Sequence, residues 1–552
     1  MTSSPGRAEG RGEAGGGHGK TVRDLAFDVM REHGLTTVFA NPGSTEVPFL
    51  GGLPDDMRFV LGLHEASVVG MATGWAIARG EAAFVLVHTT AGLGNAVAAL
   101  ATARVNRAPL VVLVGQQDRR HLAQEPFLAG RLEGLAGDYP VWVHQPACAQ
   151  DVPGALARAR HEAESAGGPA LVIVPMDDWL APVLEGHEVA APAVTLRGRA
   201  PDPAAVHRLA ALLEEAQTPA LVVGAGADSP EAWAALVAVA EKLGCPVWQE
   251  PFGARAGFPQ DHPQFAGHLP FGRARLRETL AGHDVVLAVG APAFRQYPYE
   301  PGPLTADDTR VALVSEDAAE AHRSPVELAV VASPAAVCGA LARSLSQRPA
   351  PKTPALRRPA APKPPGPGEP LRAAHVLSAL AQRLPRDAVV IEEAPSNRPE
   401  LLARLPARRP LGFLAAAMGG LGFGLPAAIG VRMALPDRPV VAVVGDGASM
   451  FAIQSLWSAA RYGVGALFVV LANGGYAVMD RLADQQDQAA PWPGFGEIDI
   501  AAMARAQMCP ARRLNTHDEL IGALDEIVPE LGARDEPLLL ETVVAPDPDY
   551  AA

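Results

Sequence analysis

The feature that most constrains this chain is a series of short, almost uninterrupted apolar runs separated by longer helical patterns. Examples are AAFVLVHTT, PLVVLVGQQ, DVVLAVGAP and RPVVAVVGDG. Parallel strands read this way when helices cover both faces of their sheet. Because 552 residues exceed what a single hydrophobic core supports, the pattern predicts an α/β protein with three doubly wound parallel-sheet domains.

Composition marks the expected limits of these domains. Residues 1–20 are rich in glycine and lack the apolar core of a signal peptide, so we expect a disordered tail there. Residues 347–370 are so rich in proline that we expect an exposed, semi-rigid linker without a packed element. The three domains are therefore predicted to span 21–190, 191–346 and 371–552, and the first and third resemble each other in pattern.

The overall charge and the cysteines narrow the class of partner and the compartment. A formal net charge of −14 argues against nucleic acid as a main partner. The sequence contains no apolar run long enough to indicate a membrane segment. The four cysteines lie far apart and match neither a metal site nor a disulfide framework. Free thiols in a reducing compartment, and hence a cytoplasmic protein, are expected.

The motif with the most specific chemistry lies in RPVVAVVGDGASMFAIQSLWSAARYGVGALFVVLANGGY. One apolar strand ends at Gly445-Asp446-Gly447, a helix follows, and the next strand ends at Asn473, 27 residues after the aspartate. A crossover helix brings both strand ends to the same carboxyl edge of the sheet. Carboxylate and amide oxygens suit Mg²⁺, and glycines let the backbone approach a phosphate. For the tripeptide alone, a plain turn is the alternative.

This stretch resembles the diphosphate-binding motif of thiamine-diphosphate-dependent enzymes. That motif ends in a pair of asparagines, and Ala472 stands in place of the first. The resemblance implies thiamine diphosphate and Mg²⁺ as cofactors, with Asp446, Asn473 and the carbonyl of Gly475 as metal ligands. The cofactor-binding residues that it implies are Glu65, Ser396, Gly419, Leu421, Gly445, Asp446, Gly447, Ala448, Ser449, Asn473, Gly475 and Tyr476.

A second candidate is Glu65, in LHEASVVGMATGWAIARG. A carboxylate at the start of an apolar helix is costly to bury unpaired, whereas an exposed one would only complement the helix dipole. In the thiamine-diphosphate family, a glutamate at this place hydrogen-bonds the pyrimidine ring of the cofactor and promotes its imino form. The resemblance implies that role for Glu65.

The resemblance covers nearly the whole chain after residue 20 and is strongest to the benzoylformate decarboxylases. It is carried by NPGSTEVPFL, LHEASVVG, VHTTAGLGNA, VPMDDW, GAPAFR and GGLGFGLPAAIG. It implies that Ser44 contacts the substrate carboxylate and that His88 acts as an acid or base. It also implies that the Gly419 carbonyl accepts from the pyrimidine amino group and that Leu421 bends the cofactor. A turn role for Ser44, a satisfied core position for His88 and close helix packing by the glycines are the alternatives.

One departure from the benzoylformate decarboxylase pattern concerns proton transfer. That family carries a second active-site histidine in the loop after GAPxFR, but this chain reads GAPAFRQYPYEP. Tyr297 is the closest positional equivalent, with Tyr299 nearby. An unperturbed phenol has a pKa of about 10 and is a poorer proton shuttle near neutrality. After the metal loop, Val478, Met479 and Leu482 lie on a predicted helix and are either core residues or an apolar wall of the substrate pocket.

These observations predict a lyase that removes CO₂ from an aromatic or branched 2-oxo acid and releases an aldehyde. The alternatives are a carboligase of the acetolactate-synthase or benzaldehyde-lyase kind and a non-catalytic protein that keeps the fold. Because family members enclose each cofactor between the first domain of one subunit and the third of its neighbour, we expect a homodimer or homotetramer. In the middle domain, GAGADS matches a dinucleotide fingerprint only weakly, since Ser229 replaces the third glycine, and a strand-to-helix turn is preferred.

Overall fold

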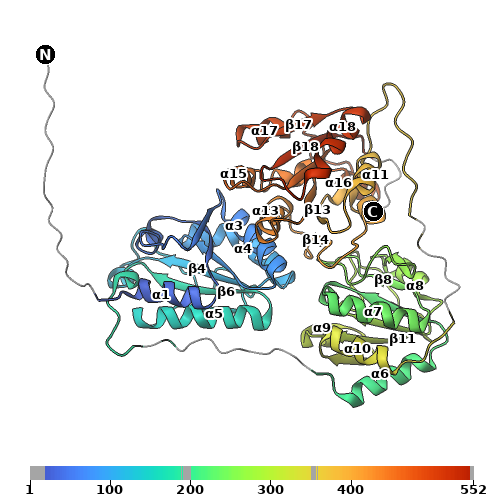
Figure 1. The fold of residues 1–552 in the computed structure, drawn as a ribbon, viewed down its shortest axis with the longest axis horizontal. Helices are drawn as coiled ribbons and strands as arrows, with labels where there is room; N and C mark the ends of the chain where they lie inside the picture. Colours follow the sequence, from blue (N-terminus) through green and yellow to red (C-terminus); the bar gives the residue numbers. More distant parts are fainter. Residues whose placement is uncertain (1–18, 188, 190–199, 350–355, 357, 547–552) are drawn as a thin grey trace.

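The structure is a computed structural model that describes residues 19–187, 189, 200–349, 356 and 358–546. It contains three sheets of six parallel strands, each with helices packed around it. The first domain (blue) and the third (orange to red) pack together, and the middle domain (green to yellow) lies beside both (Figure 1). The predicted fold class is confirmed. Most of the predicted tail, and the predicted boundary after residue 190, lie outside the described residues.

The sheet of the first domain has the strand order β2-β1-β3-β4-β6-β5. Strand β3 is apolar throughout because Phe84 and Leu86 face one buried cluster while Val85 and Val87 face another on the opposite side. The strands are β1 (Thr37–Asn41), β2 (Arg58–Leu61), β3 (Ala83–Val87), β4 (Leu110–Gln116), β5 (Trp142–His144) and β6 (Pro169–Pro175). The helices are α1 (Val22–Glu32), α2 (Val47–Leu50), α3 (Glu65–Arg79), α4 (Thr89–Val105) and α5 (Val152–Ala166).

The third domain repeats this topology, with the order β14-β13-β15-β16-β18-β17. The predicted similarity of the first and third domains is therefore one of strand order. The strands are β13 (Val389–Glu393), β14 (Phe413–Ala415), β15 (Val440–Gly445), β16 (Leu467–Ala472), β17 (Ala511–Leu514) and β18 (Leu538–Val543). The helices are α11 (Ala373–Arg383), α12 (Arg398–Arg404), α13 (Gly424–Ala434), α14 (Asp446–Ser449), α15 (Ser455–Arg461), α16 (Ala477–Asp484), α17 (Ile500–Ala506) and α18 (His517–Ile527).

The middle domain has a different order, β12-β11-β10-β7-β8-β9. Its strands are β7 (Pro219–Val223), β8 (Val247–Gln249), β9 (Phe265–His268), β10 (Val285–Val289), β11 (Arg310–Ser315) and β12 (Leu328–Val331). Its helices are α6 (Pro203–Glu215), α7 (Pro230–Leu243), α8 (Arg273–Leu280), α9 (Ala318–Arg323) and α10 (Pro334–Ser344).

The GAGADS segment of the middle domain is a strand-to-helix turn, as preferred from the sequence. Ser229 caps α7, because its hydroxyl accepts from the N–H of Ala232 at 3.1 Å. The N–H of Gly226 donates to the carbonyl of Gly290 at 2.8 Å. This backbone donor is used within the protein and is not directed at a phosphate site.

The first and third domains meet where α3 packs against α13 (Figure 1). Two glycines allow the backbones of these two helices to approach each other closely. A side-chain carbon at Gly74 would overlap the backbone of Ala427, and one at Gly430 would overlap the carbonyl oxygen of Met71. The helix that begins at Glu65 is therefore fixed against the helix that follows the GGLGFG stretch.

The described part of the predicted linker, residues 347–349, 356 and 358–370, forms no helix or strand. It is nevertheless attached to the body of the protein. Arg358 donates to the carbonyls of Ala403 and Gln260 at 2.8 and 2.7 Å. Within the described ranges, no helix combines the length and the apolarity that a membrane crossing requires.

Candidate active site

His88 follows β3 and precedes α4, and a buried carboxylate holds its ring. Nδ1 lies 3.0 Å from Oε2 of Glu46 and 3.0 Å from the hydroxyl of Thr45. Glu46, only 2% exposed, also accepts from the Thr45 hydroxyl and from the N–H of Gly43. Because an ionised carboxylate only accepts, this network assigns a proton to Nδ1. No group among the described residues hydrogen-bonds Nε2, so His88 is bound on one side of its ring and differs from a satisfied core histidine.

Glu65 is the first residue of α3 and is buried. Asn95 donates from Nδ2 to its Oε2 at 3.1 Å. Gly92, in the first turn of α4, lies against both Glu65 and His88. The structure therefore brings these two predicted residues together, and the burial of Glu65 disagrees with an exposed role at a helix terminus. Ser44 is exposed and is the first residue of the 3₁₀ helix Ser44–Glu46, which ends with the glutamate that binds His88.

The predicted metal ligands lie at the carboxyl edge of the third sheet, after β15 and β16. Asp446 is 6% exposed, and its carboxylate accepts from the N–H groups of Gly447 at 2.8 Å and Gly474 at 2.6 Å. Burial raises the pKa of Asp446, while these N–H groups act to lower it. The side-chain oxygen of Asn473 accepts from the N–H of Gly475 at 3.2 Å. The side-chain oxygens of Asp446 and Asn473 thus lie at one loop, each bound to a neighbouring glycine N–H group.

The other predicted diphosphate contacts surround that loop. Ser396, which follows β13, accepts from the N–H of Val478 at 3.1 Å and so connects β13 to α16. The ring of Tyr476 lies against Gly447 and meets Phe495 edge-on, with ring centroids 5.0 Å apart. Ser396, Asp446, Asn473 and Tyr476 are therefore brought to one edge. Gly445, Ala448 and Ser449 lie beside them in β15 and α14.

Val478, Met479 and Leu482 lie on α16, so the helix predicted after the metal loop is present. Val478 and Leu482 are half-buried and Met479 is exposed, and only Ala483 of this helix is fully buried. These side chains are therefore not core residues. Gly419 and Leu421 are likewise exposed, in the loop that precedes α13.

Tyr297 lies in the loop after β10 and is 68% exposed. Its ring packs near Phe252 and Phe271, at centroid distances of 6.5 and 6.3 Å. In the same loop, Arg295 donates to the carbonyl of Ala417 at 3.2 Å. This bond connects the Tyr297 loop to the segment that carries Gly419 and Leu421. Among the described residues, Tyr297 makes no hydrogen bond or ring contact with the other predicted site residues.

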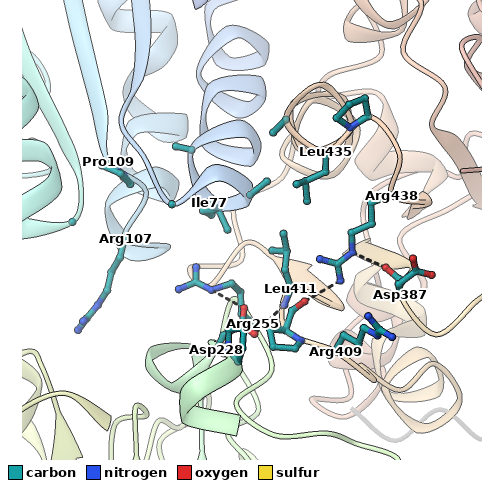
Figure 2. A pocket seen from close by; sticks show the side chains of 18 of the residues that line it. Ile77, Arg107, Pro109, Asp228, Arg255, Asp387, Arg409, Leu411, Leu435 and Arg438 are labelled. Atoms are coloured by element: carbon teal, nitrogen blue, oxygen red, sulfur yellow. Dashed lines mark hydrogen bonds and ion pairs between the residues drawn. The ribbon is translucent and has the colours of Figure 1, made fainter. Parts of the chain in front are cut away.

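A cavity of about 900 Å³ lies where the three domains meet, away from these groups (Figure 2). Its walls include Ile77 at the end of α3, Leu435 after α13, and Arg255 and Asp228 of the middle domain. None of the predicted site residues lines it. The chemistry of the side chains, and not the size of this cavity, identifies the candidate site.

Several functional partners were not predicted from the sequence. Glu46 and Asn95 hold His88 and Glu65, and Glu393 accepts hydrogen bonds from the loop before α13. Glu393 had a usable signal in the sequence, because it is the last residue of an apolar strand at the carboxyl edge of the sheet. Asp446 has a similar place, directly after the last residue of such a strand. Glu46 and Asn95 have no such signal.

Comparison with known proteins agrees with this geometry. The models for the N-terminal TPP binding domain, the central domain and the C-terminal TPP binding domain of thiamine pyrophosphate enzymes match residues 20–132, 206–341 and 400–542. A benzoylformate decarboxylase of Pseudomonas aeruginosa is 39% identical over 527 residues, which cover 95% of this chain and 98% of the relative. The chain belongs to the thiamine pyrophosphate enzyme family.

Two solved structures resemble this thiamine pyrophosphate enzyme over nearly their whole length. A thiamine diphosphate-dependent 4-hydroxybenzoylformate decarboxylase of Rhodococcus jostii RHA1 has a TM-score of 0.89 and 35% identity, covering 96% of this chain and 100% of that one. A benzoylformate decarboxylase of Polynucleobacter necessarius has a TM-score of 0.91 and 32% identity, with coverages of 96% and 99%. The family assignment made from the sequence is therefore confirmed.

Proposed function

We propose that this protein is a lyase that decarboxylates a 2-oxo acid with an aromatic or branched side chain, using thiamine diphosphate and Mg²⁺, and releases an aldehyde. The observation that carries the proposal is the pairing of a buried Glu65 with a His88 whose Nε2 is available. Both occur in a chain similar to benzoylformate decarboxylases from end to end.

The residues at the carboxyl edge of the third sheet fit the metal and the diphosphate. Asp446 is a buried carboxylate whose pKa is raised by burial, so a divalent cation beside it would offset the cost of its charge. Asp446, Asn473 and the Gly475 carbonyl would hold Mg²⁺. Ser396 and the N–H groups around Gly447 would contact the diphosphate. The bound cofactor supplies an acceptor for the electron pair left when CO₂ departs.

Residues of the first domain would handle the substrate and its protons. Ser44 would donate its exposed hydroxyl to the substrate carboxylate. Glu65 would hydrogen-bond the pyrimidine ring. His88 would give or take a proton at Nε2, because Glu46 holds Nδ1 and thereby orients the ring.

The remaining residues would shape the site. Gly419 would accept from the pyrimidine amino group through its carbonyl, and Leu421 would bend the cofactor. Val478, Met479 and Leu482 would form the apolar wall, in agreement with their partial exposure on α16. Tyr297 would donate a hydrogen bond from the loop that Arg295 ties to Ala417.

We also propose that two copies of the chain complete each site, as a homodimer or homotetramer in the cytoplasm. Large apolar side chains around the cofactor edge are exposed in the single chain, which supports a second copy covering them; these are Met418, Leu421, Phe451, Tyr476 and Met479. The four cysteines are free thiols, three buried and Cys148 exposed, in keeping with a reducing compartment.

Steady-state release of CO₂ from benzoylformate and from branched 2-oxo acids, with thiamine diphosphate and Mg²⁺ supplied, tests the proposal. We expect saturable turnover on at least one aromatic substrate and its loss in Glu65→Gln. Absence of turnover on every substrate, with cofactor bound, would contradict a decarboxylase. A Tyr297→His variant measured in parallel tests the proton step, and we expect it to change kcat more than KM.

A further inference from the structure

Glu393 is a buried carboxylate outside the predicted site, and its partners are backbone N–H groups of one loop. It ends β13 and is 6% exposed. Oε1 accepts from the N–H of Gly422, and Oε2 accepts from the N–H groups of Phe423, at 3.1 Å, and Gly424. Three consecutive N–H donors are thus bound by a single side chain.

The loop held in this way is residues 418–424, here called the cofactor loop. Its backbone needs support, because Gly419 and Gly422 have positive φ angles of 73° and 89°. Gly424 lies so close to Glu393 that an added Cβ would be 2.9 Å from Oε2. The carboxylate therefore packs directly beneath the loop and the first turn of α13, where the helix dipole also favours a negative charge.

The contacts of Glu393 differ from those of the glutamate that precedes it. Glu392, the preceding residue, pairs with Arg398 and accepts from the N–H of Ala394, so it makes different contacts. Burial raises the pKa of Glu393 to about 7, whereas the N–H groups of Gly424, Gly422 and Phe423 act to lower it. The N–H groups of the loop therefore offset part of the cost of burying this charge.

We propose that Glu393 is the positioning residue that fixes the cofactor loop, so that the Gly419 carbonyl and the Leu421 side chain are already in place when thiamine diphosphate binds. The inference rests on the proposed function for the roles of Gly419 and Leu421. It adds a carboxylate that acts on the cofactor without touching it. The geometry requires an acceptor at both oxygens, because Oε1 and Oε2 serve different N–H groups.

The Glu393→Gln variant provides the main test. Its amide nitrogen must oppose at least one of the three N–H donors, since the glutamine side chain has only one acceptor oxygen. In the full-length protein without cofactor, we expect hydrogen–deuterium exchange in peptides spanning 418–425 to accelerate by roughly tenfold or more. We expect the Kd for thiamine diphosphate with Mg²⁺ to rise by about tenfold to a hundredfold.

Two further variants serve as controls. Glu541→Gln alters another buried carboxylate of the same domain, which accepts from the N–H of Ala501 at the start of α17. It should leave both the exchange of the loop and the Kd as in the wild type. Glu393→Asp keeps two acceptor oxygens and should give values between those of the wild type and Glu393→Gln. It also replaces Glu393→Gln in the comparison if that variant does not fold.

The outcomes are distinct. Faster exchange confined to the loop, together with weaker cofactor binding, supports the inference. Unchanged exchange overturns it, and faster exchange with an unchanged Kd overturns its link to the cofactor. If the wild type itself binds no thiamine diphosphate, the proposed function fails, whereas the exchange data still decide whether Glu393 holds the loop.

Discussion

At the scale of single residues, the carboxylates around the site differ in what each one binds. Glu65 accepts from one side-chain amide, Glu46 binds an imidazole, and Glu393 binds three backbone N–H groups. All three are buried, so each charge depends on those few partners. Removing a charge while keeping the side-chain size therefore tests one interaction at a time.

Glu46→Gln removes the negative charge opposite Nδ1 of His88. Without it, the ring loses a charge-assisted hydrogen bond and its fixed orientation. We expect kcat/KM for the 2-oxo acid substrate to fall by about tenfold to a hundredfold, with little change in the affinity for the cofactor. Steady-state kinetics and cofactor titration measure both. Glu162→Gln on α5, the half-buried partner of the exposed Arg158, is the control and should behave as the wild type; equal losses in the two variants would contradict this role.

Glu393 makes stability depend on pH in the direction opposite to a typical salt-bridged carboxylate. Its pKa is raised from 4.5 to about 7 in the folded protein. The folded state therefore binds this proton more tightly than the unfolded chain does, and stability is lost as pH rises from about 4.5 to about 7. Relative to Glu393→Gln, which has no charge to lose, the wild type should lose about 3 kcal/mol over this window. Urea unfolding of both proteins across the window measures the difference, and parallel pH curves would refute it.

From the sequence, we predicted site residues that a local pattern of strand and spacing indicates. We did not predict residues whose importance depends on a partner far away in the chain. Asp446 and Asn473 were identifiable because each follows an apolar strand at a spacing typical of a crossover unit. Glu393 has the same signal, but its N–H partners lie 29 to 31 residues later in the chain. Nothing in the residue pattern states that a loop will fold back onto it.

At the scale of elements, the strands and the long helices were predictable, but their order in the sheets was not. The apolar runs correspond to β3, β4, β10 and β15. The position of β6 between β4 and β5 depends on how each crossover connection packs. The residue pattern of the strand does not indicate this packing. The helix expected after Asp446 is divided into α14 and α15. The pattern therefore predicted helical structure here but not the break within it.

The packing of α3 on α13 gives a prediction at this scale. Gly430→Ala places a methyl group where the carbonyl of Met71 lies, so the helices must separate. We expect a loss of about 1–3 kcal/mol in unfolding free energy and weaker cofactor binding, because α13 follows the cofactor loop. Gly522→Ala in α18, where nothing lies within 4 Å of the new carbon, should be neutral or slightly stabilising. Similar effects of the two substitutions on stability would exclude close packing as the cause.

At the scale of the whole molecule, one polar junction links the three domains beside the cavity in Figure 2. Asp228 and Arg255 of the middle domain form an ion pair at 3.2 Å. Asp228 accepts from the N–H of Leu411 in the third domain at 3.0 Å, and Arg255 donates to the carbonyl of Asn106 in the first at 3.3 Å. The Asn106 side chain in turn binds the third domain through the N–H of Ala417 at 2.9 Å. The domains are thus coupled through charges that water does not reach well.

This junction should behave as a buried ion pair. Burial raises the pKa of Asp228 to about 6 and lowers that of Arg255, so each charge depends on the other. Asp228→Asn leaves the guanidinium without its carboxylate and should destabilise the protein by about 3–5 kcal/mol.

A double-mutant cycle separates this coupling from simple loss of packing. Adding Arg255→Met to Asp228→Asn should recover part of the loss, because no unpaired charge then remains. Glu327→Gln, which breaks an exposed pair with Arg310 in the same domain, should change stability by less than about 1 kcal/mol. Chemical denaturation gives all the values, and additive effects of the two junction substitutions would rule out the coupling. Other bonds, such as the ion pair of Arg107 with Asp317 and the bond of Arg295 to Ala417, also hold the middle domain. Asp228→Asn should therefore lower the denaturant midpoint of unfolding without removing the contact between the domains.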